Sequence, residues 1–391
     1  MPVKTEPLIH GRVQVLPLAQ RRHLARLEEI LVEPSEPPPS CPEATGAQAA
    51  ACAQAIARAQ ERQAAVLLIY GAHLIKNGGQ LLVRQMLDHG WLSHLATNGA
   101  GTIHDWEFSW VGRSTESVRE NVATGTFGTW DETGRNLHLA LLAGGLREEG
   151  YGRALGRFIY EDGATLPDPA ELERALKAEP AHPLSPARAE LLVAMKTHPL
   201  AAGRHLVQHR CRNASVLANA FRHEIPLTVH PGIGYDIIAT HPMFNGGAIG
   251  RAAAIDFRWF AGALEKLDGG VVLSIGSAIM GPQVFEKALS CVNNLRRQEG
   301  RPVVGDFHIF VIDLQDGGGW DWTRGEPPKD NPAYYLRFCK SYSRMGGTMH
   351  YVQCDNVAFL HQVVHRLAAQ PSAARSDTPE SDADARSGLL P

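Results

Sequence analysis

The sequence shows no sign of a membrane, secreted or nucleic-acid-binding protein. Its 391 residues include 38 Lys and Arg against 41 Asp and Glu, so the formal net charge is only -3. This balance does not indicate nucleic acid or an anionic membrane as the main partner. No apolar run approaches the ~20 residues that a membrane-spanning helix needs. Charged residues interrupt the first 20 positions, so no signal peptide is apparent. We therefore expect a cytoplasmic protein.

Several common catalytic motifs are also missing. The six cysteines are scattered, without a Cys-x-x-Cys pair or zinc-type spacing, which is typical of reduced thiols in a cytosolic protein. Only His104 with Asp105 or Glu107 resembles part of a metal-ligand set, so we predict no metal site. There is no Walker P-loop, no Gly-x-Gly-x-x-Gly after a strand and no Gly-x-Ser-x-Gly elbow. The last absence argues against a serine hydrolase.

Three regions differ in composition. Residues 33–46 are rich in proline and form a spacer that excludes a helix interior or a central strand. Residues 17–32 before it resemble a short charged helix, which we expect to pack on a neighbouring subunit. Residues 1–63 as a whole are predicted to be an N-terminal arm that contains this helix and the spacer. Residues 64–370 form the predicted main domain. The Ser-, Ala-, Asp- and Arg-rich residues 371–391 are predicted to be a disordered tail.

Strand and helix patterns alternate through the central region. Residues 64–70 (AAVLLIY) are continuously apolar, as expected of a strand buried on both faces. Further strands are predicted at 92–97, 225–229, 271–275, 307–314 and 349–354, with helices at 79–88, 215–222, 252–267, 282–297, 332–345 and 357–368. This alternation predicts an α/β protein with a Rossmann-like, doubly wound, mainly parallel sheet and helices on both faces.

Glycine and small polar residues gather where the predicted strands end. In such sheets ligands bind at the carboxyl ends of the strands, where backbone amides at a helix N-terminus can approach a phosphate. Each turn alone is more often structural, but five together favour a dinucleotide. They are Gly71-Ala72-His73, Asn98-Gly99-Ala100-Gly101, Gly276-Ser277-Ala278, Asp316-Gly317-Gly318-Gly319 and Cys354-Asp355-Asn356.

Lys340 lies in a mostly apolar helical stretch between a glycine-rich turn and a strand. Helical spacing places Tyr334, Arg337, Phe338 and Ser341 around it. Aromatic neighbours would desolvate the amine and favour its nucleophilic, neutral form. The same spacing also fits an exposed lysine beside Arg337. Spacing alone leaves both interpretations open.

The region from Ala64 to Leu367 resembles the deoxyhypusine synthase family in several collinear blocks. Phe338-Cys339-Lys340 is similar to that family's Trp-Gly-Lys, and Gln353-Cys354-Asp355 to its Tyr-Ala-Asp. The other blocks are Tyr70 to Gly79, Thr97 to Asp105, Ser215-Val216-Leu217 with Gly234-Tyr235-Asp236, Gly276-Ser277-Ala278 and Asp316-Gly317.

The resemblance implies an NAD-dependent transfer of an aminobutyl group from a polyamine such as spermidine to an amine acceptor, by a homotetramer. By position, Lys340 would be the imine-forming nucleophile and Asp236 a carboxylate for the polyamine. The residues implied to line the NAD site are Ala72, His73, Asn98, Gly99, His104, Asp105, Gly276, Ser277, Ala278, Asp316, Gly317 and Asp355.

The sequence departs from the family on the substrate side. Family carboxylates and an aromatic residue near the lysine are replaced, with Tyr334 and Phe338 among the substitutes, and residues 320–331 look like an insertion. Each lost contact to an ammonium would cost ~1.5–3 kcal/mol, unless Glu286 or Asp321 takes over. We expect a different amine substrate, with a protein lysine or a small amine as acceptor. The alternatives are a non-catalytic NAD-binding paralogue and another NAD-using enzyme on the same scaffold.

Overall fold

The computed structural model describes residues 6–370, so the predicted disordered tail at 371–391 lies outside the described residues. Within the described range, no helix combines the length and the apolar character needed to cross a membrane.

The centre of the fold is a six-stranded sheet. Its strands are β2 (Val66–Tyr70), β3 (His94–Thr97), β7 (Leu227–Val229), β8 (Val271–Ile275), β9 (His308–Asp313) and β10 (Thr348–Gln353). Their spatial order is β10-β9-β8-β2-β3-β7, and every neighbouring pair is parallel. The predicted doubly wound α/β class is confirmed.

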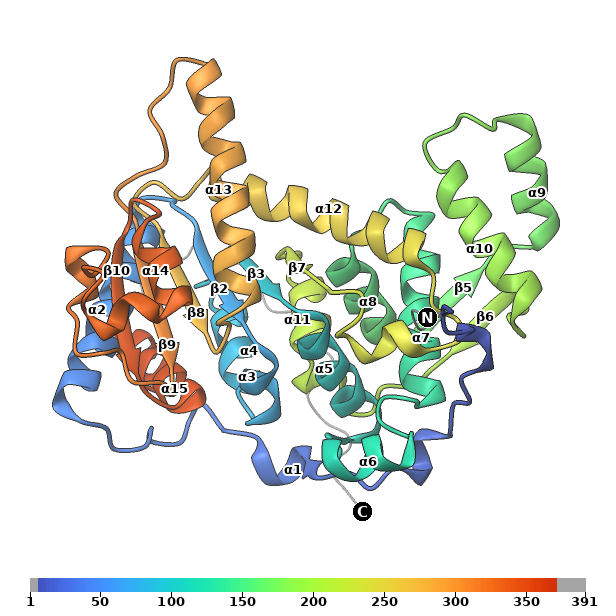
Figure 1. Cartoon of the computed structure of the whole chain (residues 1–391), viewed down its shortest axis with the longest axis horizontal. Helices are drawn as coiled ribbons and strands as arrows, with labels where there is room; N and C mark the ends of the chain where they lie inside the picture. Colours follow the sequence, from blue (N-terminus) through green and yellow to red (C-terminus); the bar gives the residue numbers. More distant parts are fainter. Residues whose placement is uncertain (1–5, 371–391) are drawn as a thin grey trace, which may run out of the picture.

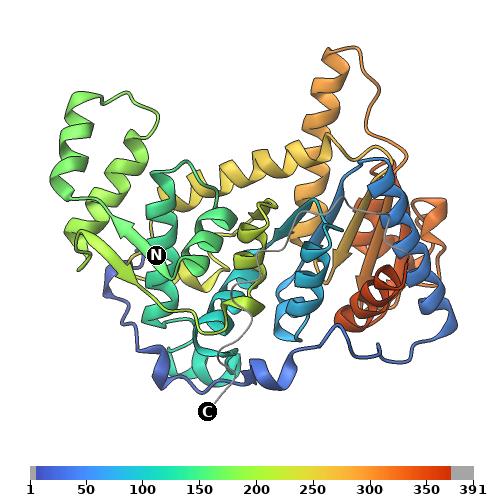
Figure 2. The same ribbon diagram turned by 180° about the vertical axis from the view of Figure 1, so that it is seen from behind.

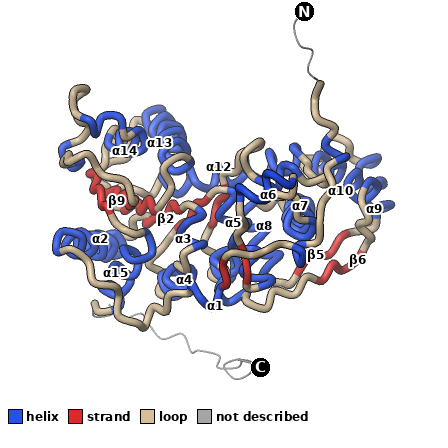
Figure 3. Tube along the Cα trace, turned by 60° about the horizontal axis from the view of Figure 1, so that its bottom comes forward, coloured by secondary structure: helices blue, strands red, loops and turns tan. Residues whose placement is uncertain are grey.

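Alternate residues of the strands point into two separate hydrophobic clusters. In β8, Val271, Leu273 and Ile275 belong to the cluster that includes helices α2 (Glu43–Glu61) and α15 (Asn356–Ala368). Val272 belongs to the opposite cluster, with α13 (Met280–Gln298) and α14 (Arg337–Ser343). Figure 3 shows these helix pairs on opposite faces of the sheet. Because both faces are covered, the central strands are continuously apolar, which made them easy to predict.

A helical lobe is inserted between β3 and β8 and stands beside the sheet (Figures 1 and 2). The sequence left most of residues 98–214 unassigned. The lobe contains α5 (Gly99–Val111), α6 (Val118–Thr124), α7 (Asp131–Gly145), α8 (Tyr151–Tyr160), α9 (Pro169–Ala178), α10 (Ser185–Thr197), α11 (Val216–Arg222) and the antiparallel pair β5 (Gly163–Leu166) and β6 (Gly203–Leu206). Helix α12 (Gly246–Leu264) leads from the lobe back to the sheet.

The predicted helix over residues 17–32 is wrong. This segment consists of the 3-10 turn η2 (Leu18–Gln20), the short strand β1 (Ala25–Arg26) and one helical turn, α1 (Leu27–Ile30). β1 pairs with β4 (Arg113–Ser114). Arg21 is buried in an ion pair with Glu107, so a tertiary contact, not local charge pattern, fixes this segment. The arm boundary at residue 63 stays a prediction; within that region, α2 packs against α15.

Candidate cofactor site at the carboxyl edge of the sheet

The chain reverses its winding direction between β2 and β8. From β2 it continues to β3 and β7 on one side, whereas β8 is followed by β9 and β10 on the other. In open parallel sheets the crevice at such a switch point, outside the carboxyl ends of the strands, is where ligands bind. The turns after β2 and β8 therefore define the candidate site.

Gly71 and Gly276 bring these two turns into close backbone contact. A Cβ atom at Gly71 would lie only 2.0 Å from the carbonyl oxygen of Gly276. Gly276 has φ +59°, a conformation that favours glycine, and a Cβ there would lie 2.5 Å from Nδ2 of Asn356. The Oδ1 atom of Asn356 is buried without a hydrogen-bond partner in the described structure. The two turns thus pack backbone against backbone, with the amides of Gly71 and Gly276 donating to the carbonyls of Ile275 and Ile312.

The turn after β8 leads into α13. Ser277 Oγ accepts a hydrogen bond of 3.1 Å from the Gly281 amide in the first turn of α13, whereas Ile279 at the N-cap position makes no side-chain hydrogen bond. Tyr342 of α14 approaches the same turn, because a Cβ at Gly281 would lie 2.7 Å from its hydroxyl. Predicted site residues Ser277 and Ala278 therefore lie at a helix N-terminus, where anions are favoured.

Asp236 meets the end of β3. Asn98 caps α5 by accepting from the Gly101 amide at 2.9 Å. A Cβ at Gly99 would lie 2.1 Å from Oδ2 of Asp236, and the same oxygen accepts from the Gly232 amide at 2.8 Å. Burial raises the pKa of Asp236 to about 6. The structure thus brings together Asn98 and Gly99 with the predicted substrate carboxylate.

Asp105 and His104 lie further along α5 and have protein partners. The Asp105 carboxylate accepts hydrogen bonds from Ser215 Oγ and from the amides of Val216 and Leu217, at 2.7 to 3.0 Å. It therefore holds the start of α11, although burial raises its pKa to about 6. His104 Nδ1 lies 2.7 Å from Ser114 Oγ, and burial lowers its pKa to about 4. Their NAD contacts stay predictions.

The remaining predicted cofactor residues follow β2, β9 and β10. Ala72 and His73 begin α3 (Ala72–Lys76). Asp316 Oδ1 accepts from the Gly318 amide at 2.8 Å, and Gly317 lies against the Tyr351 ring. Asp355 caps α15 through the amides of Val357 and Ala358. These residues share the carboxyl edge, as the sequence predicted for strand ends.

Lys340 lies on α14, and its Nζ is 3.6 Å from the centre of the Tyr334 ring. A ring face attracts an ammonium group. The buried residues of this helix are Phe338, Cys339 and Tyr342, and helical spacing places Lys340 on the opposite side. Lys340 itself is half-buried. Its role as a nucleophile stays a prediction.

The other predicted substrate residues are dispersed around this region. Phe338 is buried, with 8% exposure. Glu286 on α13 pairs with Lys287, and Asp321 caps the turn η5 (Trp322–Arg324) within the predicted insertion. Trp322 Nε1 donates to the Gly317 carbonyl at 3.1 Å. The insertion is therefore attached directly to the turn after β9.

Tyr342, near the switch point, was missed by the sequence analysis. Asn356 was named there as part of the predicted strand-end turn Cys354-Asp355-Asn356, without a contact assigned to it. Tyr342 is two residues after Lys340 and gave no signal, because its approach to Gly281 depends on how α14 packs on α13.

Comparison with known proteins gives limited information. No family model matches the chain, and no curated protein matches it. Among solved structures, ArgZ, an arginine dihydrolase from the ornithine-ammonia cycle in cyanobacteria, is 12% identical with a TM-score of 0.42, over 85% of this chain and 33% of that one. A ternary complex of AgrE with ornithine and NAD+ is 13% identical with a TM-score of 0.41, over 84% and 34%.

A conserved putative LOR/SDH protein from Methanococcus maripaludis S2 is 13% identical with a TM-score of 0.40. The match covers 87% of this chain and 72% of that protein. The chain spans about a third of the length of ArgZ and AgrE. Because these identities and TM-scores are low, the assignment to the α/β class rests on the six-stranded parallel sheet of this structure.

Proposed function

We propose that the protein is an NAD-dependent aminoalkyl transferase of deoxyhypusine synthase type, with a polyamine or related amine as donor. The observation that supports this most strongly is the meeting of the glycine turns after β2 and β8 at the switch point of the sheet. The crevice at such a switch point, beside the N-terminus of α13, suits the pyrophosphate of a dinucleotide. The collinear sequence blocks around Lys340 supply the transferase part of the proposal.

In the proposed reaction NAD, Lys340 and Asp236 would have separate roles. When bound, NAD would accept a hydride from the carbon beside the donor amine and return it at the end. The neutral amine of Lys340 would add to the carbon of the resulting imine, and the amine that carries the imine nitrogen, diaminopropane in the case of spermidine, would leave with a proton from Lys340. An acceptor amine would then displace Lys340 from the aminobutyl imine. The Asp236 carboxylate would hold an ammonium group of the substrate.

We also propose that a second copy of the chain covers the carboxyl edge. Five large apolar side chains in this region are between 65% and 74% exposed: Ile233 and Tyr235 after β7, Ile279 after β8, Leu314 after β9, and Tyr335 before α14. Apolar groups gathered at one edge are typical of an interaction surface. A homo-oligomer formed there would exclude water from the imine chemistry.

A non-catalytic NAD-binding protein is the second candidate. The observation that favours it is the position of Lys340 on the side of α14 opposite Phe338 and Tyr342. In this alternative the switch point binds NAD, whereas Lys340 serves only as a surface cation over Tyr334. The two proposals differ in product formation and not in cofactor binding.

The direct test is to incubate the full chain with NAD and spermidine, putrescine or homospermidine, and to identify new amines by mass spectrometry. The proposed transferase gives diaminopropane or another released amine and an aminobutylated acceptor, only when NAD is present. NAD binding without any new amine would support the non-catalytic alternative. Absence of NAD binding would contradict both.

Replacing Gly276 by alanine should weaken NAD binding at least about tenfold, as measured by calorimetry. The added Cβ would collide with Asn356 and would also be strained at φ +59° by roughly 1–2 kcal/mol. Gly300→Ala is the matched control, because Gly300 has φ +70° and nothing within 4 Å of an added Cβ. If both variants bind NAD equally well, the switch point is not the cofactor site.

Binding of a cationic amine should strengthen as the pH rises through about 6. Burial raises the pKa of Asp236 to about 6, so below that pH the carboxyl is neutral and above it the carboxylate attracts the ammonium. Affinity for spermidine, measured by calorimetry between pH 5 and 8 with NAD present, should show this rise. Asp236→Asn should bind weakly and lack the rise. An unchanged pH profile in Asp236→Asn would remove Asp236 from the substrate site.

A further inference from the structure

A large groove lies at the amino edge of the sheet, at the other end of the strands from the candidate cofactor site. It has a volume of about 980 Å³. Its walls come from five places: the residues before β2, the start of β3, Pro226 before β7, the α7–α10 region, and α12, which runs along it. Small-molecule sites typically occupy 300–1,000 Å³ and often lie between structural units.

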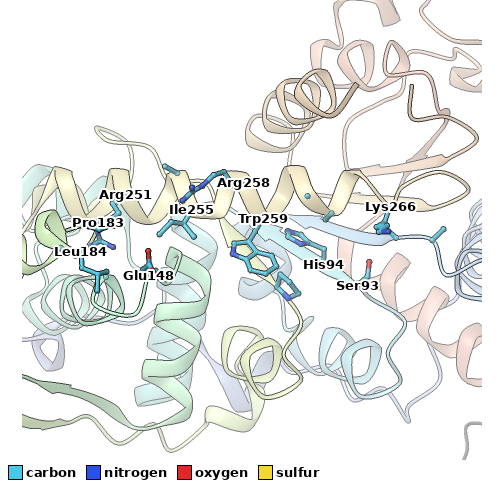
Figure 4. Close-up of a pocket in the computed structure, with 18 of the residues that line it drawn as sticks. Ser93, His94, Glu148, Pro183, Leu184, Arg251, Ile255, Arg258, Trp259 and Lys266 are labelled. Atoms are coloured by element: carbon cyan, nitrogen blue, oxygen red, sulfur yellow. The ribbon is translucent and has the colours of Figure 1, made fainter. Parts of the chain in front are cut away.

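One stripe of α12 faces this groove. Arg251, Ile255, Trp259 and Gly262 of α12 line it at the spacing of one helix face, and Lys266 lines it from the turn just after the helix. Ile255 and Trp259 lie in the middle, and Arg251 and Lys266 lie toward the two ends. Figure 4 shows the Trp259 indole extending from α12, with Glu148 on one side and His94 on the other. An apolar centre between cationic ends is therefore presented along α12.

Trp259 and Gly262 form the apolar surface. The Trp259 side chain is 59% exposed, which leaves a large aromatic surface in contact with water. Gly262, one turn further, has nothing within 4 Å of an added Cβ. Together they leave an open notch beside an exposed ring, and a flat apolar group could fill that notch and cover the indole.

The charges lining the groove are mainly positive. Arg251, Arg258 and Lys266 line it, against Glu148 as the only acidic lining residue. Arg251 is already paired with Glu190, at 3.0 Å. Neither Arg258 nor Lys266 has a side-chain hydrogen bond or an ion pair among the interactions of the described residues. The groove therefore offers unneutralised cations next to an apolar surface.

His94 forms a buried part of the groove wall. It lines the groove, its side chain is buried, and its Nε2 lies 3.1 Å from Thr228 Oγ1. Burial lowers the pKa of His94 to about 3, so it contributes no positive charge at neutral pH. The attraction for an anion comes from α12.

We infer that this groove is a second ligand site, for a small organic anion with a flat apolar body stacked on Trp259 and its anionic group near Arg258 or Lys266. The site is independent of the proposed cofactor site. The carboxyl-edge turns at Gly71 and Gly276 do not line it, so occupancy of one site leaves the other open.

The test uses 8-anilinonaphthalene-1-sulfonate, which combines flat rings with one anionic group, as a fluorescent probe of the full chain. Binding should be saturable and weaker at higher salt, and saturating NAD should not displace the probe. Gly262→Phe should weaken it at least tenfold by filling the notch. This change does not endanger folding, since glycine is among the worst residues for a helix interior. Trp259→Ala and Lys266→Gln should also weaken it.

Gly250→Phe is the matched control. Gly250 lies on the same helix, also has nothing within 4 Å of an added Cβ, and does not line the groove. This variant should bind the probe as the unmodified chain does, with circular dichroism confirming that both phenylalanine variants are folded. Equal binding by Gly262→Phe and Gly250→Phe would overturn the inference. Displacement of the probe by NAD would also overturn it, because the probe would then occupy the cofactor site.

Discussion

Replacing Lys340 by alanine is expected to abolish covalent trapping of substrate. In the proposed reaction an imine forms between Lys340 and an aminobutyl group, and cyanoborohydride would reduce it to a stable secondary amine. Peptide mass mapping after incubation with NAD and spermidine should then show the adduct on the peptide that contains Lys340. Turnover by Lys340→Ala should fall by at least about 10³-fold, because no other group would carry the intermediate.

Lys329→Ala is the control for this experiment. Lys329 is an exposed residue in the predicted insertion, 11 positions before Lys340, so its loss should leave trapping unchanged. An adduct that persists in Lys340→Ala would assign the chemistry to another residue. If the unmodified chain binds NAD but yields no adduct with any amine tested, the non-catalytic alternative is favoured, as the outward position of Lys340 on α14 would then suggest.

Arg21→Ala should reduce the free energy of unfolding by about 3–5 kcal/mol. The Arg21 side chain is 2% exposed and that of Glu107 is fully buried. Glu107 accepts two hydrogen bonds from Arg21 and others from Ser114 and Thr133. Truncation of Arg21 would leave a buried carboxylate without its cation, which is the costly way to break such a pair. Urea unfolding at pH 7 would measure the change.

Arg22→Ala provides the comparison at the adjacent position. The Arg22 side chain is 81% exposed and lies 4.0 Å from Glu120, so its loss should change stability by less than about 1 kcal/mol. Removing both charges in Arg21→Met with Glu107→Leu should recover part of the loss caused by Arg21→Met alone. Equal stability of Arg21→Ala and Arg22→Ala would show that the N-terminal segment is not anchored at Glu107.

The same pair predicts a pH dependence. Burial alone would raise the pKa of Glu107, but the Arg21 guanidinium outweighs it and lowers the pKa below the usual value. A lowered carboxyl pKa contributes stability above the unfolded pKa, and that contribution is lost as the pH falls. The stability difference between the unmodified chain and Arg21→Ala should therefore narrow below about pH 4.5.

The sheet could be predicted from the sequence because its strands are buried on both faces. The predicted strand 271–275 coincides with β8, and the predicted 307–314 contains β9. Such apolar runs between helices leave little choice of structure. The segment 17–32 could not be predicted, because its conformation depends on the distant Glu107. Most of the lobe between β3 and β8 was missed because residues 98–214 lack the alternation of strands and helices that guided the rest, whereas the predicted helix 215–222 coincides with α11.

The sequence predicted which strand ends carry the candidate site. It did not predict the contacts that its side chains make. The proximity of Lys340 to Tyr334 followed from helical spacing, although Tyr334 lies in η6 (Pro332–Tyr335) and not in α14 itself. Asp105 holds the start of α11 by accepting a hydrogen bond from Ser215, which is 110 residues later in the sequence, so no local sequence pattern indicated this contact. The amino-edge groove had no sequence signal, since Trp259, Glu148 and Leu184 come from separate segments.

The position of β2 in the sheet has a consequence for how the chain folds. β2 pairs with β3, which follows it closely, and also with β8, where Val66 lies opposite Val271. During synthesis the middle of the sheet cannot close until the helical lobe and β8 have been made. Pairing over such sequence separations is slow and leaves strand edges open for long periods. We therefore expect fragments ending before residue 271 to aggregate, and the full chain to refold slowly and with low yield at high concentration.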